Sequence, residues 1–307
     1  MRYLTAKVSL DDRSLNPHVL GWVRGWLAGQ SRLRVLEAGA GIGTMVERLL
    51  RWRLVQPERS VEYVVTDADR RLLALGATRL ERQAAALGYP VQNLGDCLRI
   101  GEALTVRFEP WDVTGPAGSM GGPFDLVIAH HLLDLLDLEA AVPVILGSLR
   151  PGGAFWFTLN ADGKTAWAPE VGDGVDDVVE GLYHASMDRH DGSAHSRTGR
   201  RLPMVIRAAG GALAAIGGSD WAIAAGPDGF RADDQTVLEA MLDFHRDALA
   251  DDFEPTVLDG WIRTRKDQLE RGELVLVVSQ VDVAGTVSSS ESVVQPASSH
   301  SASANSA

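Results

Sequence analysis

The sequence predicts an α/β fold in which a doubly wound, mostly parallel sheet carries helices on both faces. Three observations support this prediction. Short apolar segments alternate with amphipathic segments over residues 33–160, which is the pattern of consecutive βαβ units. The first apolar segment ends in a turn with three glycines at alternate positions, and polar residues follow the later apolar segments. Ligands of such sheets bind at the carboxyl ends of the strands, so these residues mark the expected site.

The composition limits the classes of function. The chain has 307 residues, of which 45% are hydrophobic, and a formal net charge of -12. These values permit one large domain and argue against broad binding to a nucleic-acid backbone. Cys97 is the single cysteine, so we expect no disulfide and no metal site. Residues 1–10 lack the apolar core of a signal peptide, and no segment reaches the roughly 20 apolar residues of a membrane span. We expect a cytoplasmic protein without a membrane partner.

The N-terminal segment is predicted to be helical. Apolar residues recur at helical spacing over residues 11–30, for example at Leu15, Val19 and Val23. We therefore expect residues 1–32 to form a helical segment before the sheet, and its apolar face packs on the domain or covers the ligand site.

A glycine-rich turn follows the first predicted strand, residues 33–37. The chain runs Glu37-Ala38-Gly39-Ala40-Gly41-Ile42-Gly43 and then enters a predicted helix over residues 44–54. Glycine adopts backbone conformations that a Cβ forbids, and it lets a ligand approach the main chain closely. We therefore expect a ligand at this turn, with the Glu37 carboxylate at the lip of the same crevice. The alternative is a structural turn that binds nothing.

The second predicted strand, residues 61–66, leads into Asp67 and Ala68. A carboxylate at the end of the second strand of a βαβ unit can accept hydrogen bonds from both hydroxyls of a ribose. Asp69 is expected to cap the following helix, residues 70–87.

Residues 104–109 alternate like a third strand and precede Trp111, Asp112 and Val113. Asp112 and Val113 therefore follow a strand end, where ligands of such sheets bind. The Trp111 ring either flanks a ligand or packs in the core.

Residues 124–129 form a nearly continuous apolar run, as in a central parallel strand. This run leads directly into His130 and His131. A helix over residues 138–149 and a fifth strand over residues 154–159 complete the alternating pattern.

Three of these segments resemble motifs of the class I S-adenosylmethionine (SAM) dependent methyltransferases that act on small molecules. The E-x-G-x-G-x-G turn differs from the G-x-G-x-x-G fingerprint of dinucleotide-binding folds. The run Phe124-Asp125-Leu126-Val127-Ile128-Ala129-His130-His131 lacks the N-P-P-Y or D-P-P-Y signature of enzymes that methylate bases or glutamine amides, and Leu149-Arg150-Pro151-Gly152-Gly153 is typical of the family. The resemblance implies a Rossmann-like sheet of seven strands, the last one antiparallel, and SAM as the cofactor.

The resemblance also assigns the strand ends to parts of the cofactor. The glycine turn would surround the methionine moiety, Asp67 would bind the ribose, and Asp112 would bind the adenine. The implied cofactor-binding residues are Glu37, Gly39, Gly41, Gly43, Asp67, Ala68, Asp112, Val113 and His130.

The second half of the chain departs from a minimal fold. The predicted elements are a helix over 202–216, a strand near 221–224, helices over 233–250 and 255–271, and a strand over 274–281. We expect the polar residues of about 160–201 and the helices of about 231–271 to form a helical cap over the substrate. The domain as a whole is predicted to span 33–283. Residues 284–307 have no apolar pattern and are expected to be a disordered tail.

Methyl transfer from a sulfonium is an in-line displacement, so the protein mainly positions and desolvates the reactants. His130 and His131 stand where the acceptor should arrive. His131 acts as a general base, or the two histidines pack against the cofactor. Tyr183, His184 and Arg200 are the expected substrate contacts, and Arg200 would bind an anionic group. The alternative for Arg200 is an exposed ion pair with a nearby acid.

The predicted activity is transfer of a methyl group to an oxygen or nitrogen atom of a small molecule. Two alternatives share the fold: an aminopropyltransferase-like enzyme that uses decarboxylated SAM, and a non-catalytic SAM-binding protein. Aminopropyltransferases usually carry paired acids where this chain has His130 and His131. A nicotinamide-dependent dehydrogenase would need the third glycine one position later. The sequence leaves the acceptor and the oligomeric state open.

Overall fold

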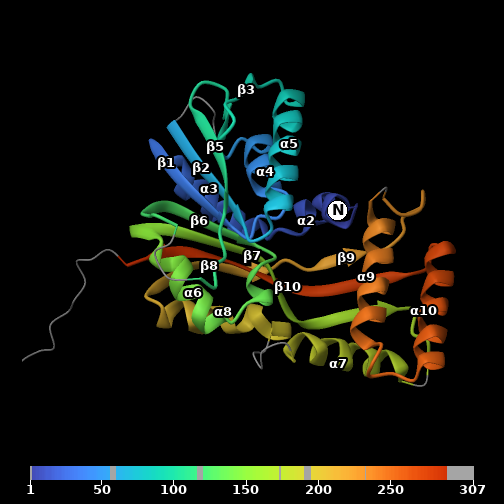
Figure 1. The fold of residues 1–307 in the computed structure, drawn as a ribbon. Helices are drawn as coiled ribbons and strands as arrows, with labels where there is room; N and C mark the ends of the chain where they lie inside the picture. The colour runs from blue at the N-terminus through green and yellow to red at the C-terminus, as the bar shows by residue number, and fades with distance from the viewer. Residues whose placement is uncertain are drawn as a thin grey trace, which may run out of the picture.

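The computed structural model describes residues 2–55, 60–115, 120–172, 174–189, 195–231 and 233–288 (Figure 1). The helices are α1 (Arg2–Ala6), α2 (Val8–Ser14), α3 (Pro17–Ala28), α4 (Thr44–Arg51), α5 (Arg70–Ala86), α6 (Leu138–Gly147), α7 (Val175–Asp188), α8 (Thr198–Ala208), α9 (Asp234–Leu249) and α10 (Pro255–Glu270), with the short 3-10 helices η1 (Leu133–Leu135) and η2 (His195–Arg197). The strands are β1 (Arg32–Ala38), β2 (Ser60–Asp67), β3 (Val91–Asn93), β4 (Cys97–Ile100), β5 (Leu104–Pro110), β6 (Phe124–His130), β7 (Leu149–Ala168), β8 (Gly211–Gly218), β9 (Trp221–Ile223) and β10 (Val275–Val287).

All ten described strands belong to one sheet, with the order β3-β4-β5-β2-β1-β6-β7-β10-β8 and with β9 paired to β10. The five central strands, β5, β2, β1, β6 and β7, are parallel. Strand β10 inserts antiparallel between β7 and β8. The predicted doubly wound sheet with an antiparallel last strand is therefore present.

Helices cover both faces of the sheet because apolar residues of the central strands alternate between the two sides. Helices α3, α4 and α5 pack on one face, where Val23, Leu49 and Leu80 join the strand residues in one core cluster. Helices α6 and α8 pack on the other face through residues such as Ile145 and Leu202. No described helix combines the length and apolar character needed to cross a membrane.

The long strands β7 and β10 continue beyond the central sheet into a second group of elements (Figure 1). Helices α7, α9 and α10 and strand β9 surround this extension, and a third core cluster lies between them, with Trp167, Leu242 and Trp261 among its members. The segments expected to cap the substrate lie in this part of the chain.

The number of strands differs from the predicted seven. Strands β3 and β4 form an antiparallel hairpin beside β5, and their three and four residues are too short for a periodic signal. The helix predicted over 202–216 is wrong in its second half, because α8 ends at Ala208 and residues 211–218 form β8. Small apolar residues in that segment fit a helix by periodicity, but pairing with β10 makes them a strand.

The predicted boundaries around β7 also need correction. Helix α6 ends at Gly147, and β7 begins at Leu149, before the Arg150-Pro151-Gly152-Gly153 sequence that was expected to separate them. The strand then extends to Ala168, nine residues beyond the predicted end at Leu159. Residues 160–168, the first part of the polar insertion, therefore continue β7 and pair with β10.

The single N-terminal helix predicted over residues 11–30 is divided into α2 and α3. Asn16 caps α3 by accepting hydrogen bonds from the His18 and Val19 amides, and Pro17 starts the helix. In α2, Asp12 pairs with Arg48 and Arg51 of α4. These ion pairs fix α2 beside the carboxyl ends of the central strands.

The predicted tail boundary at residue 284 is too early. Strand β10 runs to Val287, and Ala284, Gly285 and Thr286 pair with β7 on one side and β8 on the other. The rest of the predicted tail, residues 289–307, lies outside the described residues.

A chain that ends at Val283 is expected to melt several degrees lower than the full chain, because it loses strand pairs on both sides of β10. Thermal unfolding followed by circular dichroism measures the change. A chain that ends at Ser288 keeps every described pair of β10 and serves as the control. Equal melting temperatures for the two truncated chains would contradict a structural role for residues 284–287.

Candidate active site

The glycine turn between β1 and α4 has the conformation that its sequence requires. Gly39, Gly41 and Gly43 have φ angles of 61°, 56° and 68°, in the left-handed region that residues with a Cβ rarely adopt. A Cβ added at Gly41 would meet no atom within 4 Å. The main chain of the turn is therefore open on one side, where a ligand can approach it.

Glu37 differs from the expectation that it lies at the lip of the crevice. It is 1% exposed, and its Oε2 accepts a hydrogen bond of 2.7 Å from the Tyr63 hydroxyl. Burial raises the pKa of Glu37 to about 7, although the bond from Tyr63 acts in the opposite direction. The Glu37 carboxyl group therefore lies in the core, where it contacts Tyr63 of β2, and not at the lip of the crevice.

Asp67 lies at the end of β2 and links this strand end to the glycine turn. Its Oδ2 accepts a hydrogen bond of 2.8 Å from the Gly41 amide, and its Oδ1 accepts one from the Asp69 amide. The neighbouring Ala68 is exposed, and Asp69 caps α5 as predicted by accepting from the Arg71 amide.

Asp112 follows β5 and is exposed. It accepts hydrogen bonds from the amide and the hydroxyl of Thr114, and these bonds lower the pKa of the carboxyl group. Val113 and Trp111 are buried in the core cluster that includes residues of α6 and α8. Of the two expectations for the Trp111 ring, packing in the core is the one that the structure shows.

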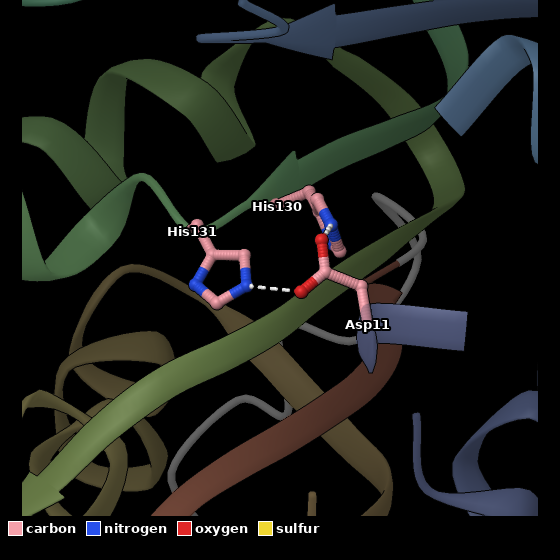
Figure 2. A group of neighbouring side chains, drawn as sticks. All are labelled: Asp11, His130 and His131. Carbon is pink, nitrogen blue, oxygen red and sulfur yellow. Dashed lines mark hydrogen bonds and ion pairs between the residues drawn. The ribbon is translucent and has the colours of Figure 1, made fainter. Parts of the chain in front are cut away.

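His130 and His131 lie at the end of β6 and share one partner, Asp11 of α2 (Figure 2). The Nε2 atom of His130 is 3.2 Å from Asp11 Oδ2, and the Nε2 atom of His131 is 3.1 Å from Asp11 Oδ1. The Nδ1 atom of His130 is 2.7 Å from the hydroxyl of Thr158 on β7. The carboxylate therefore lies between the two rings and contacts each with one oxygen.

The charges of this cluster determine which ring nitrogens carry protons. Burial alone would raise the pKa of Asp11, but Lys7 and the two histidines hold it well below its usual value. Burial lowers the pKa of both histidines, so each ring is neutral with one N–H group. The ionised carboxylate only accepts, so both Nε2 atoms must donate to it. The Nδ1 atom of His131 consequently carries a lone pair that can accept a proton, and Figure 2 shows this atom facing away from Asp11.

His131 also has an unusual backbone. Its φ angle of 51° is in the left-handed region, and its amide donates to the Thr158 carbonyl at 3.1 Å. A non-glycine residue in this region is strained by roughly 1–2 kcal/mol. Such strain clusters at functional sites because only a supporting structure maintains it.

Asp11, His130 and His131 also have the spacing of metal ligands, since their ligand atoms lie within 4.8 Å of one another. The buried Lys7 ammonium, however, lies 2.8 Å from Asp11 Oδ2. A metal ion at the same carboxylate would be repelled by this charge, and the repulsion is strong in a buried environment. We therefore interpret the cluster as a hydrogen-bonded network in which Lys7 is the cation.

A cavity of about 120 Å³ lies beside the histidine pair. His131 lines it together with Tyr3 of α1, Asp134 of η1 and Trp221 of β9. The structure also brings two of the three predicted substrate residues, Tyr183 and His184 of α7, into the lining.

Arg200 is placed differently from the prediction. It is exposed, lies outside the described lining of this cavity, and its Nε donates to Asp162 Oδ1 at 2.8 Å. Arg200 therefore forms an exposed ion pair with a nearby acid, which was the alternative expectation for this residue.

Several residues of the site were not found from the sequence. Asp11, Lys7 and Tyr3 come from the N-terminal helices, and Trp221 and Asp134 were not singled out. The spacing of Lys7 and Asp11, four residues apart on a helical pattern, predicts a local pair. It does not predict that this pair meets His130 and His131, because that contact spans 119 residues.

Comparison with known proteins places the fold. No protein-family model and no curated protein matches the sequence. The structure of a putative methyltransferase from Bacillus halodurans matches with a TM-score of 0.51 and 13% identity, over 88% of this chain and 99% of that one. A SAM-dependent methyltransferase from Thiobacillus denitrificans, in complex with S-adenosylhomocysteine, matches with a TM-score of 0.44 and 14% identity, over 88% of this chain and 92% of that one. The predicted doubly wound fold is thereby confirmed, and it is the fold of the Bacillus halodurans protein.

Proposed function

We propose that the protein is a SAM-dependent methyltransferase that acts on a small molecule. The observation that carries the proposal is a hydrogen bond between the ends of β1 and β2. The Gly41 amide, in the open glycine turn after β1, donates to the Asp67 carboxylate at the end of β2. The turn offers main-chain contacts to a ligand, and the Asp67 carboxylate can accept from ribose hydroxyls at the same place. Asp112, exposed at the next strand end, extends this ligand surface.

The second ligand belongs in the cavity lined by His131, Tyr183 and His184. When bound, SAM supplies an electrophilic methyl group on a sulfonium. His131 Nδ1 accepts the proton of an acceptor hydroxyl, and the Asp11 carboxylate stabilises the imidazolium that results. A positioned base of this kind contributes about 10²–10⁴ to the rate. The acceptor atom proposed is therefore a hydroxyl oxygen.

Titration with S-adenosylhomocysteine tests the cofactor assignment. At 100 times its dissociation constant, this ligand is expected to stabilise the protein by about 2.7 kcal/mol. Asp67→Ala should lower its affinity roughly 10- to 100-fold, because a hydrogen bond to a charged group contributes about 1.5–3 kcal/mol. Calorimetry measures the affinity, and a thermal melt checks that the variant is folded. Asp177→Ala, on an exposed residue of α7, is the matched control.

Three results would overturn the proposal or change it. Stabilisation by NAD without stabilisation by S-adenosylhomocysteine would indicate a dehydrogenase. Tighter binding of decarboxylated SAM than of SAM would favour the aminopropyltransferase alternative. Tight SAM binding without methylation of any compound in a metabolite screen with labelled SAM would favour a non-catalytic SAM-binding protein.

A further inference from the structure

Among the described residues, the charged side chains that line the cavity beside His131 are paired, with one exception. Lys164 binds Glu180 at 2.6 Å, and Asp162 binds Arg200. Asp134 lines the same cavity, but its Oδ1 atom is closed off from water without a hydrogen-bond partner among the described residues. Burial raises the pKa of this carboxyl group, although the nearby His131 and Lys7 and the Ala161 amide act in the opposite direction. Asp134 is therefore the one charged residue of this lining that forms no ion pair within the described part of the chain.

A second acceptor without a partner lies in the same lining. Gln280 of β10 is 5% exposed, and its Oε1 atom has no described partner. Buried oxygen atoms in native proteins are nearly always hydrogen-bonded, so an exception in the lining of a cavity is a position where a bound ligand or water can supply the missing donor. The oxygen atoms of Asp134 and Gln280 can each accept a hydrogen bond from a ligand. The Asp134 carboxylate forms its strongest hydrogen bonds with a positively charged donor.

The remaining walls also favour a cation. Three aromatic residues, Tyr3, Tyr183 and Trp221, are among the lining residues. Burial and the nearby Asp134 charge raise the pKa of Tyr183 to about 12, so its hydroxyl stays neutral next to the acid. Ring faces attract cations, so aromatic residues in the lining suit a positively charged ligand.

We propose that this cavity binds a protonated amine of the acceptor molecule, with the Asp134 carboxylate as its ion-pair partner and the aromatic side chains as its walls. This proposal rests on the proposed methyltransferase function and names the substrate class. An amine held in this way stays protonated and has no lone pair to attack a methyl group. It is therefore an anchor, and the methylated hydroxyl is a second group of the same molecule, close to His131. This proposal differs from the sequence-based expectation, in which Arg200 would bind an anionic group of the substrate.

The experiment measures binding of matched probes by calorimetry, with S-adenosylhomocysteine present and absent. Tyramine and phenylethylamine carry the ammonium group, 4-propylphenol and propylbenzene replace it with a methyl group, and 3-(4-hydroxyphenyl)propanoate carries a negative charge. We expect the ammonium probes to bind at least tenfold more tightly than their neutral partners. Asp134→Asn and Asp134→Ser should each remove this preference. Asp177→Asn, the same change on exposed α7, should retain it.

The two proposals fail in different ways. We expect Asp134→Asn to bind S-adenosylhomocysteine with the wild-type affinity. This result shows that the variant is folded and that its cofactor site is intact. Equal affinities for ammonium and neutral probes, tighter binding of the anion, or no binding of any ammonium probe at 10 mM would overturn the amine assignment. If the wild-type protein does not bind S-adenosylhomocysteine, the proposed function is overturned, whatever affinities the amine probes show.

Discussion

Replacing Asp11 with asparagine is expected to destabilise the protein by about 3–5 kcal/mol, the cost of breaking a buried ion pair. The variant leaves the Lys7 ammonium buried without its carboxylate, and it removes the common acceptor of His130 and His131. Urea unfolding at pH 7 measures the difference. Because the pKa of Asp11 is lowered in the folded state, its contribution is present above the unfolded pKa of about 3.9 and is lost as the pH falls below it. The difference between wild type and variant should therefore shrink below about pH 4.

A second substitution distinguishes the ion pair from general damage to the core. Lys7→Met in the Asp11→Asn background removes the uncompensated charge, so we expect it to restore part of the lost stability. Asp252→Asn breaks the exposed pair with Arg189 and should cost less than about 1 kcal/mol. A loss of stability for Asp11→Asn as small as that for Asp252→Asn would contradict the charge network derived for the site.

Replacing Gly285 with alanine is expected to destabilise the protein by about 3 kcal/mol or more, at the upper end of overpacking costs. Gly285 lies in β10 between β7 and β8, next to an irregularity in its pairing with β8. A Cβ added there would lie 2.0 Å from the carbonyl oxygen of Ala212 and 2.7 Å from the Phe155 ring. The carbonyl belongs to the backbone of a neighbouring strand, so a side-chain rotation cannot relieve the contact.

Gly260→Ala is the matched control for this change. Gly260 lies in α10, and a Cβ added there meets no atom within 4 Å. Alanine is a better helix former, so this variant should gain roughly 0.5–1 kcal/mol. Denaturant unfolding of the two variants should thus give opposite signs. Little or no loss for Gly285→Ala would show that β8 and β10 are not packed as closely as the structure describes.

The parts of the fold that were predicted correctly depend on local signals. The glycine turn after residues 33–37, the apolar run over 124–129 and the cap at Asp69 each carry their information within a few residues. Strands β1, β2, β5 and β6 consequently appear within one or two residues of their predicted bounds. The errors concentrate where pairing decides the structure. Residues 211–218 became a strand, and β7 and β10 extended past their expected ends, because neighbouring strands supply hydrogen bonds that no periodicity records.

The sequence by itself determined the sheet class, the conformation of the glycine turn and the acidic residues at the strand ends, because each depends on the backbone preferences of adjacent residues. Only the tertiary structure decided what surrounds the histidine pair. Asp11 reaches His130 across 119 residues of sequence, and the α2–α4 ion pairs of Asp12 hold it there. The tertiary structure also turned Glu37 into the core and paired Arg200 with Asp162, and it left one Asp134 oxygen beside the cavity with no partner among the described residues. Burial and charge compensation are properties of the packed chain, and a linear pattern does not contain them.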